Sequence, residues 1–139
     1  PSTSVIGPGA PIPIPPGTSR VDHEAELGVV IGRHTSRVRA DDALRHVLGY
    51  TVVNDVTARD MQRSDGVFAR AKGFDGFCPL GPWIRTDLDP GDLAVRAWVD
   101  GELRQDGRTS DMVFGVAELI AFISGVMTLR PGDVIATGT

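Results

Sequence analysis

Short runs of apolar and β-branched residues recur along the chain and predict strands. Residues 24–31 (EAELGVVI) and 49–56 (GYTVVNDV) carry the densest of these runs, with polar residues only at their ends. Asp100 and Gly101 form a dipeptide that favours a tight turn between two strands. The weaker runs predict three further strands, over 93–99, 102–105 and 134–137.

Apolar residues at helical spacing predict helices over 40–48 and 113–127, and a helical turn over 57–63. Residues 1–19 hold six prolines and three glycines, which disfavours helix and predicts an extended, turn-rich lead-in. Residues 33–39 fit a weak strand or a turn. Because short strands outnumber helices, the pattern predicts a β-rich α+β fold.

Composition narrows the range of functions. The 139 residues are 41% hydrophobic, which is enough for a single domain with its own core. A net charge of -4 and scattered arginines disfavour a nucleic-acid partner. Cys78 is the only cysteine, so no internal disulfide can form, and no apolar run approaches the roughly 18 residues of a membrane span. We therefore expect a cytoplasmic protein without a membrane or nucleic-acid partner.

The start of the first strand carries two carboxylates. Side chains alternate along a strand, so Glu24 and Glu26 leave the same face, whereas His23 leaves the other face with Ala25. Asp55 stands at the end of the next predicted strand, so a third carboxylate is available. Oxygen ligands of this kind suit Mg²⁺, Mn²⁺ or Ca²⁺ better than zinc. The alternative is that these acids are solvated residues at strand ends, since E-x-E is a common spacing.

Hydrogen-bond donors accompany these carboxylates in the sequence. Arg59 and Gln62 are three residues apart, which places them on one side of the predicted helical turn. Lys72 is the only lysine beside thirteen arginines. Donors of this kind suit an anionic, oxygen-rich ligand on a metal. They favour a metal site, although a lone lysine could also be an ordinary surface residue.

Four motifs follow one another along the chain: EAEL (24–27), NDVTARDMQ (54–62), RAKGFDGFCPLGPW (70–83) and LRPGDVIATGT (129–139). In order and spacing they resemble the catalytic C-terminal domain of the fumarylacetoacetate hydrolase family, over nearly the whole chain. This resemblance implies a mixed β-sandwich roll with short helices, a homodimer, and one bound Mg²⁺ or Mn²⁺. Relative to the family's motifs the chain starts and stops in mid-motif, so we expect the single catalytic domain at 1–139 to continue beyond both ends.

The resemblance also implies a role for each matching residue. Lys72 would be catalytic, beside the substrate's oxyanion. The metal ligands would be Glu24, Glu26 and Asp55, and the substrate would be bound by Arg59, Gln62, Gly138 and Thr139.

The activity implied is chemistry on small 2-oxo acids or their enols. Within the family, the run at 70–83 is most similar to enzymes that isomerise or decarboxylate 2-hydroxyhepta-2,4-diene-1,7-dioate in aromatic catabolism. The alternatives are hydrolysis of carbon–carbon bonds in acylpyruvate- or fumarylacetoacetate-type substrates, and decarboxylation of oxaloacetate. A hypothesis of another class is a binding module that keeps the fold but has lost its chemistry.

Overall fold

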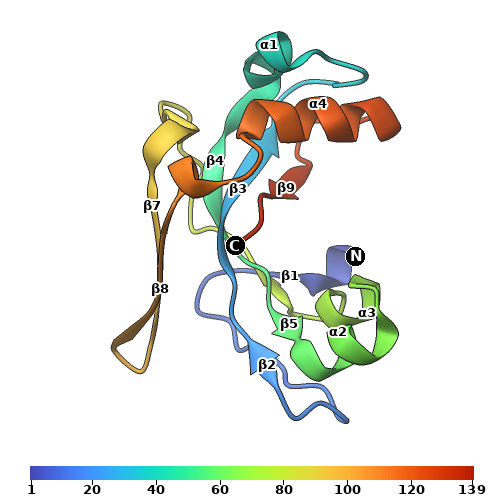
Figure 1. Ribbon diagram of the computed structural model, residues 1–139, viewed down its shortest axis with the longest axis vertical. Helices are drawn as coiled ribbons and strands as arrows, with labels where there is room; N and C mark the ends of the chain where they lie inside the picture. The colour runs from blue at the N-terminus through green and yellow to red at the C-terminus, as the bar shows by residue number, and fades with distance from the viewer.

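The computed structural model describes residues 1–139, and its centre is a three-stranded antiparallel sheet of order β4-β3-β9 (Figure 1). Strand β3 (Ala25–Ile31) is buried at all seven positions, as its apolar sequence requires. On one edge it pairs with β4 (Val47–Asn54), with Ala25 opposite Asn54. On the other edge β9 (Val134–Ala136) pairs only with residues 28–30 of β3. The edge of β3 nearest Glu24 is therefore left free by β9.

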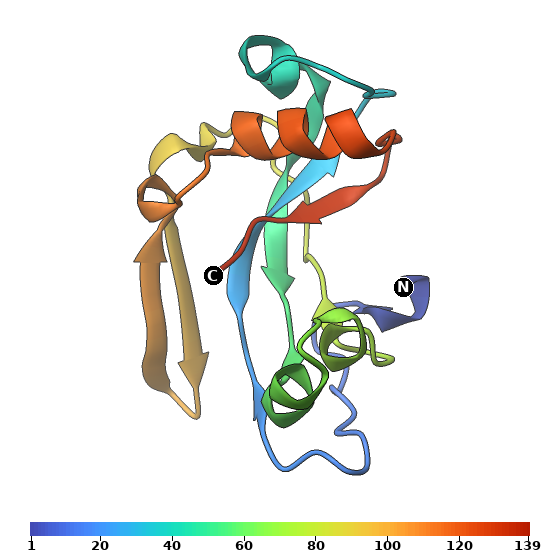
Figure 2. The ribbon, with the colours of Figure 1, turned by 45° about the vertical axis from the view of Figure 1, so that its right-hand side comes forward.

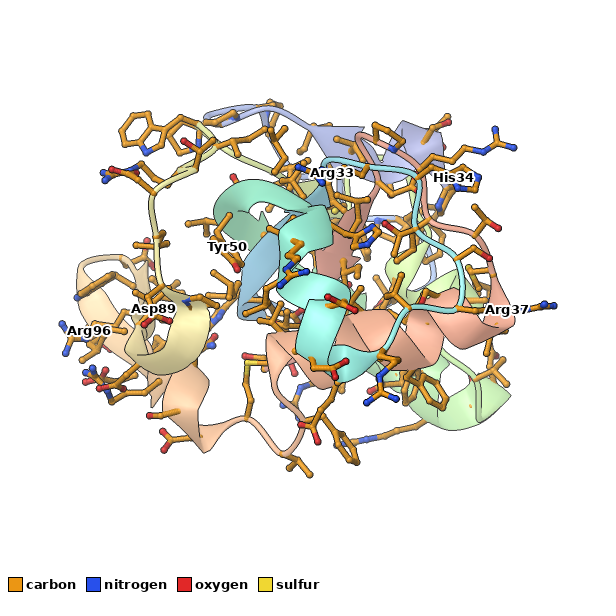
Figure 3. The ribbon with its side chains drawn as sticks, turned by 90° about the horizontal axis from the view of Figure 1, so that it is seen from above. Arg33, His34, Arg37, Tyr50, Asp89 and Arg96 are labelled. Atoms are coloured by element: carbon orange, nitrogen blue, oxygen red, sulfur yellow. The ribbon has the colours of Figure 1, made fainter.

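Helix α4 (Val116–Val126) crosses one face of this sheet, with α1 (Ala40–Ala43) beside it (Figure 1). Ile120 of α4 is fully buried in one core cluster with side chains of the sheet, including the buried Tyr50. Burial of apolar area is what holds this layer together. Seen from above, Tyr50 lies inside the molecule, whereas His34 and Arg37 lie at its rim (Figure 3).

A second, smaller core lies at the other end of the sheet, under α2 (Arg59–Asp65) and α3 (Ala69–Lys72) (Figure 1). Met61, Ala71 and Phe77 are buried there. Two short pairs of strands lie next to this second core. These are β2 (Val21–Asp22) with β5 (Thr57–Ala58), antiparallel, and β1 (Val5–Ile6) with β6 (Cys78–Pro79), parallel.

The remaining sheet is a separate hairpin of β7 (Ala94–Val99) and β8 (Glu102–Arg108), which stands beside the central sheet (Figure 2). Its turn is the predicted Asp100-Gly101 pair, and both residues have a positive φ. Four single turns of 3-10 helix complete the fold: Ser2–Ser4, Leu44–His46, Pro90–Asp92 and Thr109–Asp111. None of the helices has the length and apolar character needed to cross a membrane.

The α+β, β-rich class is confirmed, and the differences from the sequence predictions lie at element ends. The helix predicted over 40–48 stops being α-helical at Ala43, because Val47 and Leu48 already belong to β4. Thr57 and Ala58 form strand β5 and not the first turn of the following helix. Residues 33–39 contribute a single bridge, between Thr35 and Leu129, and no strand. These boundaries are set by pairing with strands that are distant in sequence, so the local periodicity of apolar residues does not predict them.

Two glycines give a matched test of packing. A Cβ on Gly49 would lie 2.4 Å from the carbonyl oxygen of Arg85, whereas a Cβ on Gly125 of α4 would meet nothing within 4 Å. We expect Gly49→Ala to lower the free energy of unfolding by about 1–3 kcal/mol, because the backbone must shift. Gly125→Ala should leave it unchanged or raise it by up to about 1 kcal/mol. Urea unfolding measures both, and equal stabilities would contradict this packing.

Candidate metal centre

The predicted site residues meet in a hollow of about 330 Å³ between β3, α3 and the C-terminal residues. The ring of Phe68 forms part of its wall. Of the eight residues predicted from the sequence, only Arg59 does not line the hollow, and it is hydrogen-bonded to a residue that does. The seven that line it are Glu24, Glu26, Asp55, Gln62, Lys72, Gly138 and Thr139.

Strand register brings two of the carboxylates together. Ala25 is paired with Asn54, so the residues just outside the pairing, Glu24 and Asp55, lie side by side. The amide of Asp55 donates to the carbonyl of Glu24 at 2.8 Å, and the amide of Glu24 donates to the side-chain oxygen of Asn54 at 2.9 Å. Glu26, two residues along β3, returns to the same side. One carboxylate oxygen from each of Glu24, Glu26 and Asp55 lies within 4.8 Å of the other two.

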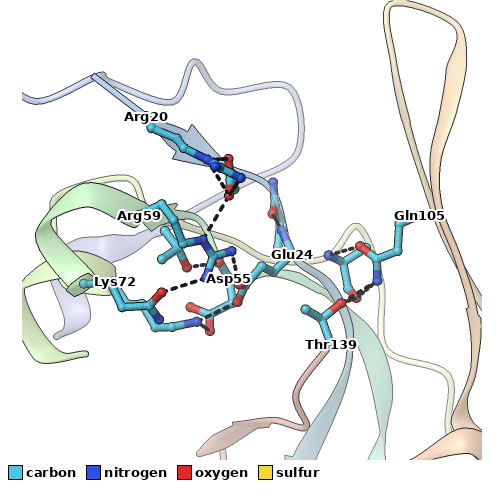
Figure 4. Close-up of polar contacts among 12 residues, drawn as sticks. Arg20, Glu24, Asp55, Arg59, Lys72, Gln105 and Thr139 are labelled. Atoms are coloured by element: carbon cyan, nitrogen blue, oxygen red, sulfur yellow. Dashed lines mark hydrogen bonds and ion pairs between the residues drawn. The ribbon is translucent and has the colours of Figure 1, made fainter. Parts of the chain in front are cut away.

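Glu24 is buried and held by two cations. The ammonium of Lys72 donates to its Oε2 at 2.7 Å, and Arg59 donates to its Oε1 at 2.5 Å (Figure 4). Burial raises the pKa of Glu24, but the hydrogen bonds from Lys72 and Arg59 outweigh this and hold the pKa below its ordinary value. Glu24 is therefore an ionised carboxylate.

Lys72 reaches the carboxylates from the last residue of α3. The preceding residue, Ala71, is fully buried in the second core and anchors this short helix. The Lys72 ammonium bridges Glu24 and Asp55, and it also lies 6.0 Å from the centroid of the Phe68 ring. Burial lowers the pKa of Lys72, but the hydrogen bonds to Asp55 and Glu24 outweigh it and keep the pKa above its usual range. Lys72 thus contributes a positive charge and hydrogen-bond donors.

Glu26 is the most buried acid in the hollow, at 3% exposure, and it forms no ion pair. Its hydrogen bond is from the amide of Gly138 to Oε2, at 2.8 Å. Burial raises the pKa of Glu26; the Gly138 amide offsets part of this, and the negative charge of Asp55 adds to the rise. Buried carboxylates are normally paired with a cation or bound to a metal. Glu26 is consequently the residue that most needs a further positive charge.

The donor set fits a hard divalent cation. Oxygens that share one such ion lie at most about twice a metal–oxygen bond apart, or about 4–5 Å, and the three carboxylates meet this limit. Three carboxylates face the two cations Lys72 and Arg59, so the cluster carries one net negative charge. A divalent ion would reverse that sign and favour an anionic ligand. The acidic triad can therefore hold a metal.

Arg59 and Gln62 lie on one side of α2, as their spacing predicts. The guanidinium of Arg59 donates from Nη1 to Oε1 of Gln62 at 2.8 Å and from Nε to Asp22 at 2.9 Å. With the bond to Glu24, these contacts occupy much of the guanidinium. Arg59 is therefore oriented by the acids around it, and Gln62 faces the hollow.

Sequence reasoning missed three residues around the site: Asp22, Asn54 and Gln105. Asp22 and Asn54 orient Arg59 and the backbone of Glu24. Gln105 comes from the β7–β8 hairpin and binds the backbone of Ala25 (Figure 4). Asp22 could have been found from strand alternation, since it shares a face with Glu24, but Gln105 is eighty positions from Ala25 and has no local signal.

The three histidines and the cysteine lie outside the hollow. His23 is not among its lining residues, and its Nδ1 is buried without a hydrogen-bond partner. His34 is exposed, and His46 contacts the hydroxyl of Thr35 at 2.9 Å. Burial raises the pKa of the Cys78 thiol, which opposes a nucleophilic role.

Comparison with known proteins identifies relatives that share both sequence and shape. The model of the family described as fumarylacetoacetate (FAA) hydrolase C-terminal matches residues 1–139. The structure of 5-carboxymethyl-2-hydroxymuconate delta-isomerase from Mycobacterium smegmatis is 54% identical, with a TM-score of 0.98, and the match covers 100% of this chain and 55% of that one. The structure of 2-hydroxyhepta-2,4-diene-1,7-dioate isomerase from Mycobacterium marinum is 52% identical, with a TM-score of 0.98. That match covers 100% of this chain and 55% of the other.

A curated relative has a different named activity. Oxaloacetate tautomerase YisK from Bacillus subtilis is 49% identical over 125 residues, which are 88% of this chain and 42% of the relative. The chain also spans only part of the length of five further curated relatives, from 52% to 64%.

Proposed function

The chain belongs to the fumarylacetoacetate hydrolase family, and we propose that it acts as a divalent-metal-dependent enzyme that interconverts 2-oxo acids and their enol forms. The observation that carries this proposal is the buried carboxylate of Glu26, which has no ion pair and lies within 4.8 Å of Glu24 and Asp55. Such a group needs a cation, and the three oxygens match the ligands of Mg²⁺, Mn²⁺ or Ca²⁺.

The chemistry of a 2-oxo acid suits this arrangement. Held by Glu24, Glu26 and Asp55, a divalent cation would supply positive charge that stabilises the enolate form of a 2-oxo acid. Lys72 would donate a hydrogen bond from Nζ to the substrate's developing oxyanion, and Gln62, whose side chain is held by Arg59, would contact its other oxygens. Gly138 and Thr139, which also line the hollow, would bind a carboxylate of the substrate.

We place the substrate among 2-hydroxyhepta-2,4-diene-1,7-dioate-type diacids, with oxaloacetate as the smaller candidate. The support is the named activities of the relatives, two isomerases and one tautomerase, which share a proton shift next to a carbonyl group. The same enolate is also reached by loss of CO₂ or by carbon–carbon cleavage, so decarboxylation and hydrolysis are the alternative reactions. A homodimer remains a prediction from the family resemblance, and a cytoplasmic location remains a prediction from the composition of the chain.

One assay series separates these possibilities. The protein is given oxaloacetate, an acylpyruvate and a hydroxyheptadienedioate, each with Mg²⁺ and with EDTA, and enol absorbance, CO₂ and cleavage products are followed. We expect a Mg²⁺-dependent change in enol absorbance without CO₂ or cleavage. Glu24→Ala should abolish it, whereas Asp41→Ala, which removes an exposed carboxylate paired with Arg39, should not. Unchanged turnover in Glu24→Ala would contradict the metal role.

A binding module without chemistry makes a different prediction. Calorimetric titration with Mg²⁺ and oxalate, a small mimic of the enolate, should give saturable binding to an enzyme of this kind. A degenerate module should bind neither.

A further inference from the structure

The side chain of Gln105 completes the hydrogen bonding of Ala25, the residue between the two glutamates. Its Oε1 accepts from the amide of Ala25 at 2.9 Å, and its Nε2 donates to the carbonyl of Ala25 at 2.6 Å. The same Nε2 donates to the hydroxyl of Thr139 at 2.6 Å, and that hydroxyl donates to the carbonyl of Ala25 at 3.1 Å. One carboxamide therefore joins two segments of the candidate site (Figure 4).

At Ala25 the edge of β3 that faces away from β4 has no neighbouring strand, so its backbone groups are free to bind a side chain. Residues on either side of Ala25 bond toward β4, so the amide and carbonyl of Ala25 point to the other edge of β3. Strand β9 covers that edge only at Gly28, Val29 and Val30. Ala25 is buried, and a buried peptide group without partners is costly. The Gln105 carboxamide has the same donor and acceptor as a peptide group, so it replaces the missing strand at this one position.

The alternation of side chains along β8 places Gln105 on the face of the hairpin that is turned toward β3. Arg104 and Asp106, its neighbours, are exposed and form ion pairs on the hairpin surface, with Glu102 and Arg96. Gln105 is half-buried and points across to β3. Through this side chain the hairpin therefore contacts the backbone between Glu24 and Glu26.

We infer that Gln105 is a positioning residue. It fixes the backbone amide and carbonyl of Ala25, the residue that separates Glu24 from Glu26, and it holds the Thr139 hydroxyl against the carbonyl of Ala25. Glu24 and Glu26 are then kept at the spacing that a shared cation needs. Thr139 is held at a fixed position beside them. The consequence for metal binding rests on the proposed function, whereas the restraint on Ala25 does not.

The test compares Gln105→Met, which keeps the size of the side chain and removes all three hydrogen bonds, with Arg104→Met as the control on the same strand. In EDTA, hydrogen–deuterium exchange at the amide of Ala25 should become at least about tenfold faster in Gln105→Met. The Mg²⁺ dissociation constant from calorimetry should rise by about 10- to 100-fold, the usual effect of losing a partner behind a metal ligand. Arg104→Met should change neither quantity.

Gln105→Glu gives a second variant in case the methionine variant does not fold. It keeps the acceptor for the Ala25 amide and loses the donor to the carbonyl, so its effects should fall between those of the wild type and Gln105→Met. Unchanged exchange in both variants would overturn the inference, as would faster exchange with an unchanged Mg²⁺ affinity. If the wild-type protein binds no Mg²⁺, the proposed function fails, and exchange at Ala25 alone then supports or overturns the restraint.

Discussion

Replacing Lys72 by methionine is expected to lower turnover by about 10²- to 10³-fold, the usual effect of removing one donor to a developing oxyanion. The ammonium bridges Glu24 and Asp55, and it is the only lysine in the chain, so no neighbouring amine can replace it. The same change leaves two close carboxylates with less compensating charge. We therefore also expect the metal-free protein to lose about 1–3 kcal/mol of stability.

Arg70→Met is the control, since Arg70 lies on the same short helix but pairs with Asp65 at the surface. It should keep full turnover and close to wild-type stability, because an exposed ion pair contributes little to folding. Steady-state kinetics with Mg²⁺ and urea unfolding in EDTA measure the two effects of Lys72→Met separately. Turnover within threefold of the wild type would show that the Lys72 ammonium does not act on the substrate.

A charge-conserving variant separates the effect of the positive charge of Lys72 from the effect of its shape. Lys72→Arg keeps one positive charge near Glu24 and Asp55, so it should recover most of the lost stability. A guanidinium is planar and longer than an ammonium, so it should not recover turnover. Recovery of both quantities would mean that Lys72 supplies charge alone.

The central features of the site could be predicted from the sequence because they depend on local geometry. Alternation in a strand places Glu24 and Glu26 on one face, and one helical turn separates Arg59 from Gln62, as the structure has them. The approach of Asp55 follows from the pairing of two neighbouring strands. These relations need no knowledge of distant segments.

Other features depend on contacts between segments far apart in the chain. Lys72 reaches Glu24 because buried Ala71 anchors α3 to the second core, and no periodicity in the sequence places that helix. The clamp of Gln105 on Ala25 depends on where the whole hairpin lies. The early start of β4 at Val47 likewise depends on its partner Ile31. Local sequence patterns therefore could not predict these contacts, because each depends on how distant segments pack together.

Replacing Glu26 by glutamine is expected to stabilise the metal-free protein and to weaken its response to Mg²⁺. The carboxylate is buried without an ion pair, and an amide of the same shape can still accept the hydrogen bond from Gly138. In EDTA at pH 7 the melting temperature of Glu26→Gln should therefore exceed that of the wild type, by about 2–4 °C for each kcal/mol gained. In Mg²⁺ the order should reverse, because one of three ligands has lost its charge and the dissociation constant should rise at least about tenfold.

The pH dependence of this difference has a definite sign. Burial, together with the charge of Asp55, raises the pKa of Glu26 in the fold above the ordinary value of 4.5 that applies in the unfolded chain. Below that value the carboxyl is protonated in both states, so it does not affect stability. As pH rises from the unfolded to the folded pKa, the unfolded chain gives up the proton first, and the wild type loses stability.

Glu26→Gln lacks this titration, so in EDTA the two melting temperatures should converge near pH 4 and separate as the pH rises. Glu24, whose pKa is lowered by Lys72 and Arg59 despite its burial, contributes stability that is lost as pH falls, but it does so in both proteins and cancels in the comparison. Melting curves between pH 4 and pH 8, with EDTA and with Mg²⁺, measure the effect. A wild type that is more stable than Glu26→Gln in EDTA at pH 7 would show that Glu26 already has its compensating charge without a metal.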